Sequence, residues 1–549
     1  MVLSVIKNDI TKEQFKTGNF NNHILSTTVV LIIIIIFTIF LRLYTLDIPL
    51  ERDEGEYAYA GQLILDGYAP YQHIYSMKLP GIYYIYAGVM AVFGETARGI
   101  HLGLLLFNII TILCLFYLVA QIINKKAATV AALFYAILSA NHSVVGLSAN
   151  AEHFLVFPAL LGILLLLKAM QSHKDWLLFF SGLCLGICFA IKQQGVVYAI
   201  FALVYLLVHL YGIRPFLFRF MIKIIAIFSI GLAVPYLLIC IIMYLSGTFP
   251  AFWFWTVKYA QAYSSLVSLS EGLLFLKQQV VYMFTSSPLI WLMVIIGLLL
   301  LIIDNNLRGR RSFIILFVLF SFLAVCPGLY FRQHYFILFL PAAALLAGLS
   351  TNFLEGLIRK FASSPIHQNI ILFAIICLCA LPTLYMQRYI FRMSPFQISR
   401  HIYGENPFPE SIEISRIIRS YTAQNDSVLI LGSEPQILFY SHRRSATGYI
   451  YMYPLLESQD YALKMIKDMI REVEISRPQL LVNVHIEKSW FIRQDSHDEI
   501  LFNWINEYQK QYKLIGIVDI FKDNTKYYLE PNLSLPKSSN FIALYKKME

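Results

Sequence analysis

Residues Thr28 to Leu46 read TVVLIIIIIFTIFLRLYTL, and the charged stretch Arg52-Asp-Glu-Gly-Glu-Tyr57 follows a few residues later. The apolar run is long enough for a helix that crosses the hydrocarbon core of a membrane, which needs about 17 to 25 residues. It has no small-residue cleavage site, so we expect it to remain as an anchor. Carboxylates close to a membrane are costly and usually mark a pathway or an active site. The two stretches together predict a membrane protein with a polar site beside its first span.

The composition of the whole chain agrees with a polytopic membrane protein. Of its 549 residues, 58% are hydrophobic and only 14% are charged, a balance that a soluble globule cannot bury. The formal net charge is +10, but the Lys and Arg residues are scattered among short loops, which argues against nucleic-acid binding. The 7 cysteines all lie in apolar segments, so neither a disulfide framework nor a cysteine metal site is expected.

The chain has further apolar windows of a length that suits membrane spans. We expect about eleven transmembrane helices, near residues 27–46, 97–120, 128–146, 151–168, 176–191, 194–210, 221–245, 286–303, 312–327, 334–350 and 369–388. Several of these windows are short or nearly continuous with the next, so their number is the least certain part of the assignment. The fold class predicted is a polytopic α-helical membrane protein of the cell (plasma or inner) membrane.

Basic residues predict the orientation, because they collect in the short loops on the cytoplasmic side of a membrane. Such residues precede the first window and follow the second, fourth, sixth, eighth and tenth. They are Lys7, Lys12, Lys16, Lys125, Lys126, Lys168, Lys174, Arg214, Arg219, Lys223, Arg308, Arg310, Arg311, Arg359 and Lys360. We therefore expect a cytoplasmic N-terminus and a C-terminal region outside the cytoplasm.

The composition divides the chain into three parts. Residues 1–26 are expected to form a cytoplasmic segment, and residues 27–392 a transmembrane domain whose first outer loop spans 47–96. From residue 393 onward charged residues, Pro and Asn become common, and the length of roughly 150 residues suits an independent domain. Short β-rich runs near 428–431, 480–482, 514–518, 526–529 and 541–545 alternate with helix-like stretches at 409–423 and 461–473. An extracytoplasmic soluble α/β domain is predicted.

Polar residues that are costly near a membrane all fall on the predicted outer side. They are Asp53, Glu54, Lys78, Asn150, Glu152, Lys192, Arg332 and His334. A transport path is expected to carry such groups at mid-depth and on both sides of the membrane. The one-sided pattern instead favours chemistry on a lipid-borne substrate at the outer surface.

Several motifs in the same order resemble GT-C type glycosyltransferases, especially the bacterial enzymes that are protein-mannosyltransferase-like or aminoarabinose-transferase-like. The first outer loop carries Arg52-Asp-Glu-Gly-Glu-Tyr-Ala-Tyr-Ala-Gly61, Gly67-Tyr-Ala-Pro-Tyr71 and Lys78-Leu-Pro-Gly81. Later motifs are Ser148-Ala-Asn-Ala-Glu152, Ala190-Ile-Lys-Gln193 and Arg332-Gln-His-Tyr-Phe336. The resemblance covers about residues 27 to 350. Leu79 departs from it, because Lys-Pro-Pro is common at this point of the family, but Lys78 is kept.

The resemblance implies a hexosyl- or pentosyltransferase that moves a sugar, with inversion, from a polyprenyl-phosphate carrier to an acceptor hydroxyl on a glycolipid, polysaccharide or protein of the cell envelope. Asp53 is expected to take the proton of the acceptor, and Glu54 is the second catalytic candidate. Cationic side chains hold the phosphate in such a reaction. The substrate-binding candidates are Lys78, Glu152, Lys192, Arg332, His334, Tyr57 and Tyr71. No cofactor and no metal ligand is assigned, and a divalent metal remains open.

Structural roles compete with these assignments. Asp53-x-x-Glu56 also reads as a capping box that opens a helix from Glu54 to Leu65, and Glu152 also suits the N-terminus of a helix. Arg42 is interpreted as a structural or snorkelling residue. The outer loop from Gly247 to Pro288, with its aromatic residues at 252–255, is expected to form an aromatic belt at the interface that gates carrier access. The alternative functions are a flippase or transporter of a lipid-linked saccharide and a scaffold without catalysis.

Overall fold

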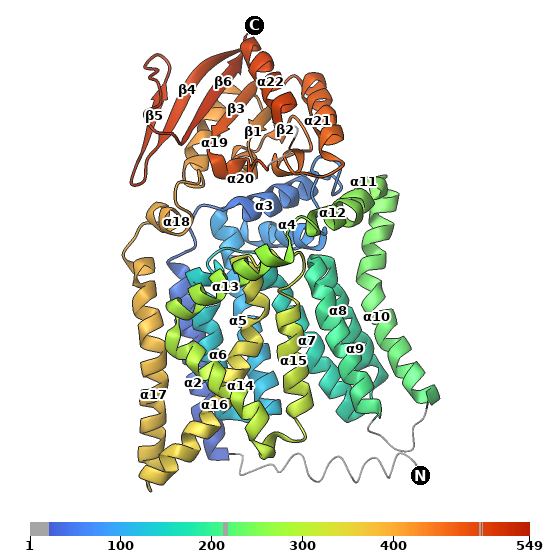
Figure 1. Ribbon diagram of the computed structural model, residues 1–549, viewed down its shortest axis with the longest axis vertical. Helices are drawn as coiled ribbons and strands as arrows, with labels where there is room; N and C mark the ends of the chain where they lie inside the picture. Colours follow the sequence, from blue (N-terminus) through green and yellow to red (C-terminus); the bar gives the residue numbers. More distant parts are fainter. Residues whose placement is uncertain (1–20, 212–217, 494–495, 497, 549) are drawn as a thin grey trace.

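The computed structural model describes residues 21–211, 218–493, 496 and 498–548. Within these residues Figure 1 shows a tall helical part below and a sheet-containing part above. Helices that run across the molecule lie between them, among them α3 (Arg52–Leu65) and α13 (Leu269–Ser286). Residues 1–20 of the predicted cytoplasmic segment 1–26, with Lys7, Lys12 and Lys16, and the loop residue Arg214 lie outside the described residues. Residues 21–26 belong to α2.

A helix overlaps each of the apolar windows. These helices are α2 (Asn21–Leu43), α5 (Ala97–Ile122), α6 (Lys125–Leu138), α7 (Ala151–Ser172), α8 (Asp175–Ile191), α9 (Val196–Tyr211), α10 (Phe218–Leu245), α14 (Pro288–Ile303), α15 (Arg311–Leu323), α16 (Leu340–Phe361) and α17 (Pro365–Met386). Most of the exposed large hydrophobic side chains of the chain lie on this bundle, as expected where lipid is the solvent. The predicted multi-pass helical membrane protein is confirmed.

The number of complete spans is smaller than the number of windows. In the described part of the chain, 6 helices are long and apolar enough to cross a membrane, and α13 with α14 makes a seventh if this pair, bent by 112°, counts as one span. Segments 27–43, 175–191 and 311–323 are apolar but shorter, and so is the short α4 (Gly81–Phe93) in the outer layer. The expected count of eleven is therefore not confirmed. Window length alone misjudges helices that are short or that bend at a break, such as the one at Ser287.

The upper part is a mixed sheet with helices. The strands are β1 (Ser427–Leu431), β2 (Arg444–Ser445), β3 (Leu480–His485), β4 (Tyr512–Ile520), β5 (Thr525–Leu529) and β6 (Phe541–Lys547), in the order β2-β1-β3-β6-β4-β5. β1 pairs in parallel with β2 and β3, and the remaining pairs are antiparallel. The five β-rich runs of the sequence are all strands. The helices are α18 (Pro395–Tyr403), α19 (Glu410–Tyr421), α20 (Pro435–Ser441), α21 (Ala462–Ser476) and α22 (Asp498–Tyr508). We call residues 393–549 the C-terminal domain, and its exact limits stay a prediction.

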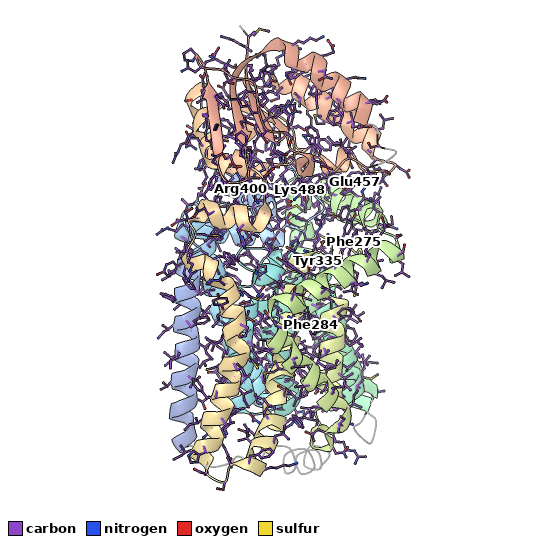
Figure 2. All side chains as sticks on the ribbon, turned by 60° about the vertical axis from the view of Figure 1, so that its left-hand side comes forward. Phe275, Phe284, Tyr335, Arg400, Glu457 and Lys488 are labelled. Carbon is purple, nitrogen blue, oxygen red and sulfur yellow. The ribbon has the colours of Figure 1, made fainter. Side chains whose placement is uncertain are left out.

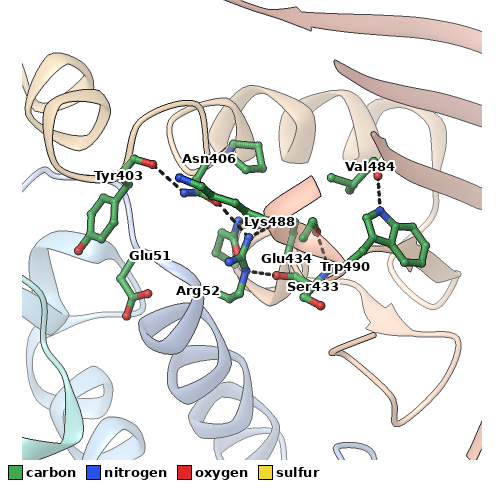
Figure 3. Close-up of polar contacts among 12 residues, drawn as sticks. Glu51, Arg52, Tyr403, Asn406, Ser433, Glu434, Val484, Lys488 and Trp490 are labelled. Carbon is green, nitrogen blue, oxygen red and sulfur yellow. Dashed lines mark hydrogen bonds and ion pairs between the residues drawn. The ribbon is translucent and has the colours of Figure 1, made fainter. Parts of the chain in front are cut away.

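The C-terminal domain is docked on α3. A Cβ atom added to Gly55 would lie 2.5 Å from the backbone nitrogen of Gln436 in α20, so only glycine permits this approach. Beside it, the Arg52 guanidinium donates to the Ser433 carbonyl at 2.5 Å and pairs with the Glu434 carboxylate at 2.5 Å (Figure 3). It also donates to Asn406 Oδ1 at 3.3 Å. These contacts fix the position of the C-terminal domain relative to α3.

A second close approach brings two predicted motifs together. A Cβ atom on Gly81, the first residue of α4, would lie 2.3 Å from the Ala190 carbonyl oxygen near the end of α8. The Gln193 side chain also donates to the Met77 carbonyl at 2.7 Å. The turn that carries Lys78 is therefore held against the turn that carries Lys192. Motifs more than a hundred residues apart in the sequence thus meet at the end of the bundle that faces the C-terminal domain.

Candidate active site

A cavity of about 860 Å³ lies between one end of the helical bundle and the C-terminal domain. The lower part contributes predicted site residues, and the C-terminal domain contributes residues that the sequence analysis did not single out. In Figure 2, Glu457 and Lys488 lie on the underside of the C-terminal domain and Tyr335 lies below them. The charged and aromatic lining residues include Asp53, Tyr57, Lys78, Lys192, Arg332, His334, Tyr451, Tyr453, Glu457 and Lys488.

Asp53 and Lys78 form the central ion pair of the cavity. The Lys78 ammonium lies 2.5 Å from Asp53 Oδ1 and 2.8 Å from Glu56 Oε2. The Tyr451 hydroxyl of the C-terminal domain donates to Asp53 Oδ1 at 3.4 Å. Asp53 lies in the first turn of α3, where the helix dipole favours a negative charge. Its carboxylate therefore faces the cavity with one ammonium and one hydroxyl already in place.

The capping box expected at Asp53 and Glu56 is formed by other residues. Glu51 is the N-cap of α3, and its carboxylate accepts from the backbone N–H groups of Asp53 and Glu54 at 3.1 and 3.3 Å. The Glu54 side chain accepts from the Glu51 N–H at 3.0 Å, so the box is Glu51 with Glu54, and α3 begins at Arg52. The prediction was wrong by two residues because the sequence offers acidic residues at both spacings. Asp53 is thereby free of a capping role.

Glu54 is not brought to the cavity. Its side chain is 1% exposed and accepts from His101 Nε2 at 2.9 Å and from the Ala149 backbone N–H at 2.6 Å. These bonds tie α3 to α5 and to the Ser148–Glu152 motif. The contacts indicate that Glu54 positions the surrounding backbone, and a part in the chemistry stays a prediction.

Two tyrosines of the first outer loop position Lys78. The Tyr57 ring lies 4.6 Å from the Lys78 ammonium, at a distance that suits a cation–π contact, and lines the cavity. Tyr71 is buried outside the cavity lining, and its hydroxyl donates to the Lys78 carbonyl at 2.6 Å. Glu56, which the sequence analysis did not select, is fully buried and accepts from the Tyr83 hydroxyl at 2.6 Å. The Lys78 side chain is therefore held on three sides.

A second ion pair joins Glu152 to Lys192. Glu152 is buried in the first turn of α7, and its Oε1 bonds the Lys192 ammonium at the end of α8. The Lys192 ammonium also lies 4.3 Å from the Tyr335 ring centre. His334 lies between the two pairs, with Nε2 at 3.9 Å from both Asp53 Oδ2 and Glu152 Oε1. We call Asp53, Lys78, Glu152, Lys192 and His334 the charged cluster.

The surroundings shift the proton affinities of this cluster. Burial opposes ionisation of Asp53, but the charges of Lys78 and Arg332 outweigh it and hold the pKa of Asp53 well below its usual value. Burial favours neutral Lys78, yet Asp53 and Glu56 raise the pKa of Lys78. Burial lowers the pKa of His334 to about 4, so its imidazole is neutral near pH 7. At neutral pH Asp53 and Lys78 are thus both charged, and His334 is neutral.

Arg332 lies in the cavity but outside the ion pairs. Its guanidinium donates to the Tyr263 hydroxyl at 3.5 Å and lies 5.4 Å from the Tyr330 ring centre. The side chain is exposed and lines the cavity. This arrangement leaves most of its donors available to a ligand.

The loop before Pro288 differs from the expected aromatic belt. Trp255 and Tyr259 are buried and line the cavity, Phe252 is fully buried, and Trp253 is 43% exposed. A π-helical turn over Phe254–Tyr259 follows α11 (Phe249–Trp253) and precedes α12 (Ala260–Ser264). Such turns often occur at functional sites, because one extra residue re-aims the side chains. The loop therefore forms a wall of the cavity.

The sequence analysis missed Tyr451, Tyr453, Glu457 and Lys488. A signal was present in the run Tyr449-Ile-Tyr-Met-Tyr453, since aromatic residues in a loop of a polar domain need a partner surface. Nothing in the sequence indicated that this loop meets Asp53. The pairing depends on the docking of α20 against Gly55.

The donor set does not fit a metal ion. In the part of the chain that the structure describes, no group of three or more His, Cys, Asp or Glu side chains is arranged to hold one. Asp53 and Glu152 lie near His334, but each carboxylate is already neutralised by a lysine. We therefore derive no step through a metal.

Comparisons with known proteins agree with this geometry. Residues 77–239 match the sequence family described as dolichyl-phosphate-mannose-protein mannosyltransferase. The structure of ArnT from Cupriavidus metallidurans bound to undecaprenyl phosphate matches with a TM-score of 0.58 and 13% identity, over 94% of this chain and 98% of that chain. The chain has the GT-C glycosyltransferase fold. The resemblance expected from the motifs, and with it the predicted enzyme class of a glycosyltransferase, is confirmed.

A second group of structures supports the same fold. The archaeal oligosaccharyltransferase AglB from Archaeoglobus fulgidus, in complex with an inhibitory peptide and a dolichol-phosphate, matches with a TM-score of 0.52 and 13% identity, over 93% of this chain and 75% of that chain. No curated protein sequence matches the chain. The family match includes the Lys78, Glu152 and Lys192 motifs, whereas Asp53 and Arg332 lie outside the matched residues. At these identities the structural likeness concerns the fold.

Proposed function

We propose that this GT-C chain transfers a sugar from a polyprenyl phosphate to an acceptor hydroxyl inside the cavity, with inversion at the anomeric carbon. The observation that carries the proposal is the Asp53 carboxylate, which faces the cavity 2.5 Å from the Lys78 ammonium and has no capping role. A proton acceptor and a cation beside each other suit an acceptor hydroxyl and an anionic leaving group.

The reaction balances with the residues present. The acceptor oxygen forms a bond to the anomeric carbon, and the bond from that carbon to the phosphate oxygen breaks, so its electron pair leaves on the phosphate. The acceptor proton passes to Asp53. Lys78, Lys192 and Arg332 stabilise the charge on the departing phosphate. Attack from the face opposite the phosphate inverts the configuration.

The ion pair also explains how a weakly basic carboxylate acts as the base. In the described structure Lys78 holds the pKa of Asp53 well below its usual value, which makes the carboxylate a poor proton acceptor. An anionic phosphate competes for the Lys78 ammonium and weakens this effect, because a charge shared between two anions stabilises each one less. Donor binding thereby raises the basicity of Asp53 when the acceptor needs it.

The same proposal includes an outward-facing site. Basic residues of alternate loops, such as Lys125 and Arg359, lie at the ends of helices opposite the cavity, as the positive-inside rule requires for a cytoplasmic face. Reporter fusions after Glu549 test this point. An alkaline phosphatase fusion is expected to be active and a green fluorescent protein fusion dark. The reverse result would place the cavity on the cytoplasmic side of the membrane.

Asp53→Asn tests the chemistry. The variant keeps the size of the side chain and, because Glu51 caps α3, the stability of the helix, but it removes the proton acceptor. We expect turnover to fall by about 10² or more, with thermal stability close to that of the parent. The measurement is transfer from polyprenyl-phosphate sugars to cell-envelope material by the purified protein.

Asp47→Asn is the matched control. Asp47 is also an acidic residue of the first outer loop, but it is exposed and pairs with Arg98 at 2.5 Å away from the cavity lining. Parental turnover is expected from this variant, since exposed ion pairs contribute little. An Asp53→Asn protein that transfers sugar at the parental rate would remove Asp53 from the role of base.

A further inference from the structure

One wall of the cavity is aromatic. The ring centres of Trp255 and Tyr259 lie 5.0 Å apart, and those of Tyr259 and Tyr263 lie 6.4 Å apart. Tyr263 stacks on Tyr330 at 4.7 Å with an interplanar angle of 11°. All of these residues line the cavity, and we call them the aromatic wall. The wall starts at Arg332, which contacts the Tyr263 hydroxyl, and therefore adjoins the place proposed for the phosphate.

A buried carboxylate of the C-terminal domain lies beside the aromatic wall at Tyr259. Glu457 lines the cavity with a side chain that is 6% exposed. Its Oε2 accepts from the Tyr259 hydroxyl at 2.6 Å, whereas Oε1 has no hydrogen-bond partner among the described residues. Burial raises the pKa of Glu457 to about 7, against the opposing effects of Tyr259, Arg493 and Arg332. A carboxylate oxygen in a cavity that has no partner in the protein can accept a hydrogen bond from a hydroxyl group of a ligand.

The mechanism does not use Glu457. No ion pair joins it to a cation within the described residues, in contrast to Asp53 and Glu152, which each hold a lysine. The proposed base and the proposed phosphate ligands lie in the charged cluster. Glu457 and the aromatic wall thus form a second, chemically different part of the same cavity.

We propose that the aromatic wall and Glu457 form an acceptor subsite for a carbohydrate, in which Glu457 binds sugar hydroxyl groups and sets the acceptor preference. The inference rests on the proposed function and names the substrate class of its acceptor side. A carboxylate accepts hydrogen bonds from hydroxyl groups with charge-assisted strength. Flat aromatic faces cover the apolar C–H face of a sugar ring, and their hydroxyl groups serve its polar edge.

The architecture of the cavity favours a carbohydrate over a peptide. Extended peptides are commonly bound by an open strand edge that supplies backbone hydrogen bonds. None of the described residues that line this cavity belongs to a β-strand, and the C-terminal domain contributes the turns near Tyr453 and Lys488 instead. A neutral ligand with many hydroxyl donors matches rings and an acceptor atom better than an amide backbone does.

The proposed subsite is connected to the proposed base, Asp53, through Tyr451 and Tyr453. The Tyr451 ring stacks on Tyr453 at 5.6 Å with an interplanar angle of 11°, and both rings line the cavity. The Tyr451 hydroxyl contacts Asp53 Oδ1 at 3.4 Å. An acceptor sugar held by the C-terminal domain therefore has a path to the proton acceptor, and the hydroxyl that reacts is the one that reaches Asp53.

Ligand-observed NMR on the purified full chain tests the subsite without the transfer reaction. The probes are mannotriose, maltotriose and chitotriose, and a peptide of six residues that contains Ser and Thr is the comparison. At least one trisaccharide is expected to show saturation transfer through its ring protons. Glu457→Gln keeps the size and the Tyr259 contact but loses the charge, so the Kd of that trisaccharide should rise about tenfold, the cost of one charge-assisted bond.

Glu472→Gln is the matched control. Glu472 is also a carboxylate of the C-terminal domain that accepts from a tyrosine of the lower part, Tyr75, at 3.0 Å, but it does not line the cavity. This variant should bind the trisaccharide with the parental Kd. Because this binding is measured without the transfer reaction, a failure of the proposed chemistry and a failure of the subsite give different results.

Three outcomes would overturn the inference. They are the absence of binding by all the trisaccharides, equal trisaccharide Kd values for the parent and Glu457→Gln, and binding of the peptide that depends on Glu457. In a transfer assay, Glu457→Gln should raise the acceptor KM while the donor KM stays the same. A change in the donor KM alone would assign Glu457 to the phosphate side.

Discussion

The charged cluster and the aromatic wall face the same cavity but are built in different ways. In the charged cluster each carboxylate is matched by an ammonium, Asp53 by Lys78 and Glu152 by Lys192. In the aromatic wall one carboxylate, Glu457, has a tyrosine hydroxyl as its partner. Pairing lowers the free-energy cost of holding a charge near a membrane. The ammonium of such a pair can still exchange its carboxylate partner for an incoming anion. A lone acceptor among rings suits a ligand that is neutral and rich in hydroxyl groups.

The two regions also depend on different parts of the fold. The charged cluster is built by α3, α7, the turns after α3 and α8, and the turn before α16 that carries His334. The aromatic wall, in contrast, needs the C-terminal domain to bring Glu457 to Tyr259. The two regions therefore face a common cavity only when the C-terminal domain is docked on α3. Variants that disturb docking, the charged cluster or Glu457 separate these contributions.

The largest effect is expected from Gly55→Leu. Leucine favours helix, but its side chain would overlap the Gln436 backbone, so the C-terminal domain cannot keep its place. Transfer should fall by about 10² or more, since two tenfold steps correspond to roughly 3 kcal/mol of lost contacts. Amide hydrogen exchange over residues 435–441 should rise in parallel.

Gly88→Leu is the control for this variant. Gly88 lies in the neighbouring helix α4, and an added Cβ meets no atom within 4 Å. Parental transfer and exchange are expected. If Gly55→Leu also kept the parental transfer rate, the charged cluster would act without the C-terminal domain, and the comparison drawn above would fail.

A smaller effect, confined to the charged cluster, is expected from Lys78→Ala. The variant leaves Asp53 and Glu56 without their shared cation and removes a charge-assisted contact to the phosphate. The donor KM should rise more than about tenfold. Arg332→Ala should cost less, because its contact to Tyr263 is 3.5 Å long and the side chain is exposed.

Lys258→Ala controls for the loss of a positive charge near the cavity. Lys258 is exposed in the π-helical turn, next to lining residues, but does not line the cavity. Its donor KM should equal that of the parent. If the donor KM rose equally in Lys78→Ala, Arg332→Ala and Lys258→Ala, Lys78 would act only through its positive charge at a distance and not through contact with the phosphate.

The smallest effect is a pH dependence of acceptor use. The pKa of Glu457 is raised to about 7, so the ionised fraction falls as the pH drops from 8 to 6. Because the ionised form makes the stronger hydrogen bonds, the acceptor KM should rise severalfold over that range. The pKa values of Asp53 and His334 lie lower, so neither group titrates in this interval.

The matching measurement is the acceptor KM of Glu457→Gln between pH 6 and 8. This acceptor KM should not change with pH, and it should be close to the acceptor KM of the parent at pH 6. A parental slope in this variant would assign the pH dependence to another group, such as the buried Glu51, whose pKa is also raised by burial.

Much of the charged cluster was predictable from the sequence. Ionisable residues beside long apolar runs are conspicuous because their burial is costly, and Asp53, Lys78, Glu152, Lys192 and His334 were all selected on that ground. The capping box was placed two residues too late, since Glu51, Asp53, Glu54 and Glu56 offer two registers with the same spacing. The structure also moves Glu54 away from the cavity, which its position in the motif did not reveal.

The sequence by itself determined the class of the protein, the order of its helices and strands, and the polar residues near one end of the bundle. Hydrophobic runs and alternation are local patterns, so they can be interpreted without knowing what lies nearby in space. The tertiary structure alone decided which of these residues meet. Glu457 and Tyr451 come from a polar domain where carboxylates and tyrosines are common, and nothing local distinguishes them. They become part of the site because Gly55 allows the backbones of α3 and α20 to approach closely, and that contact joins residues hundreds of positions apart.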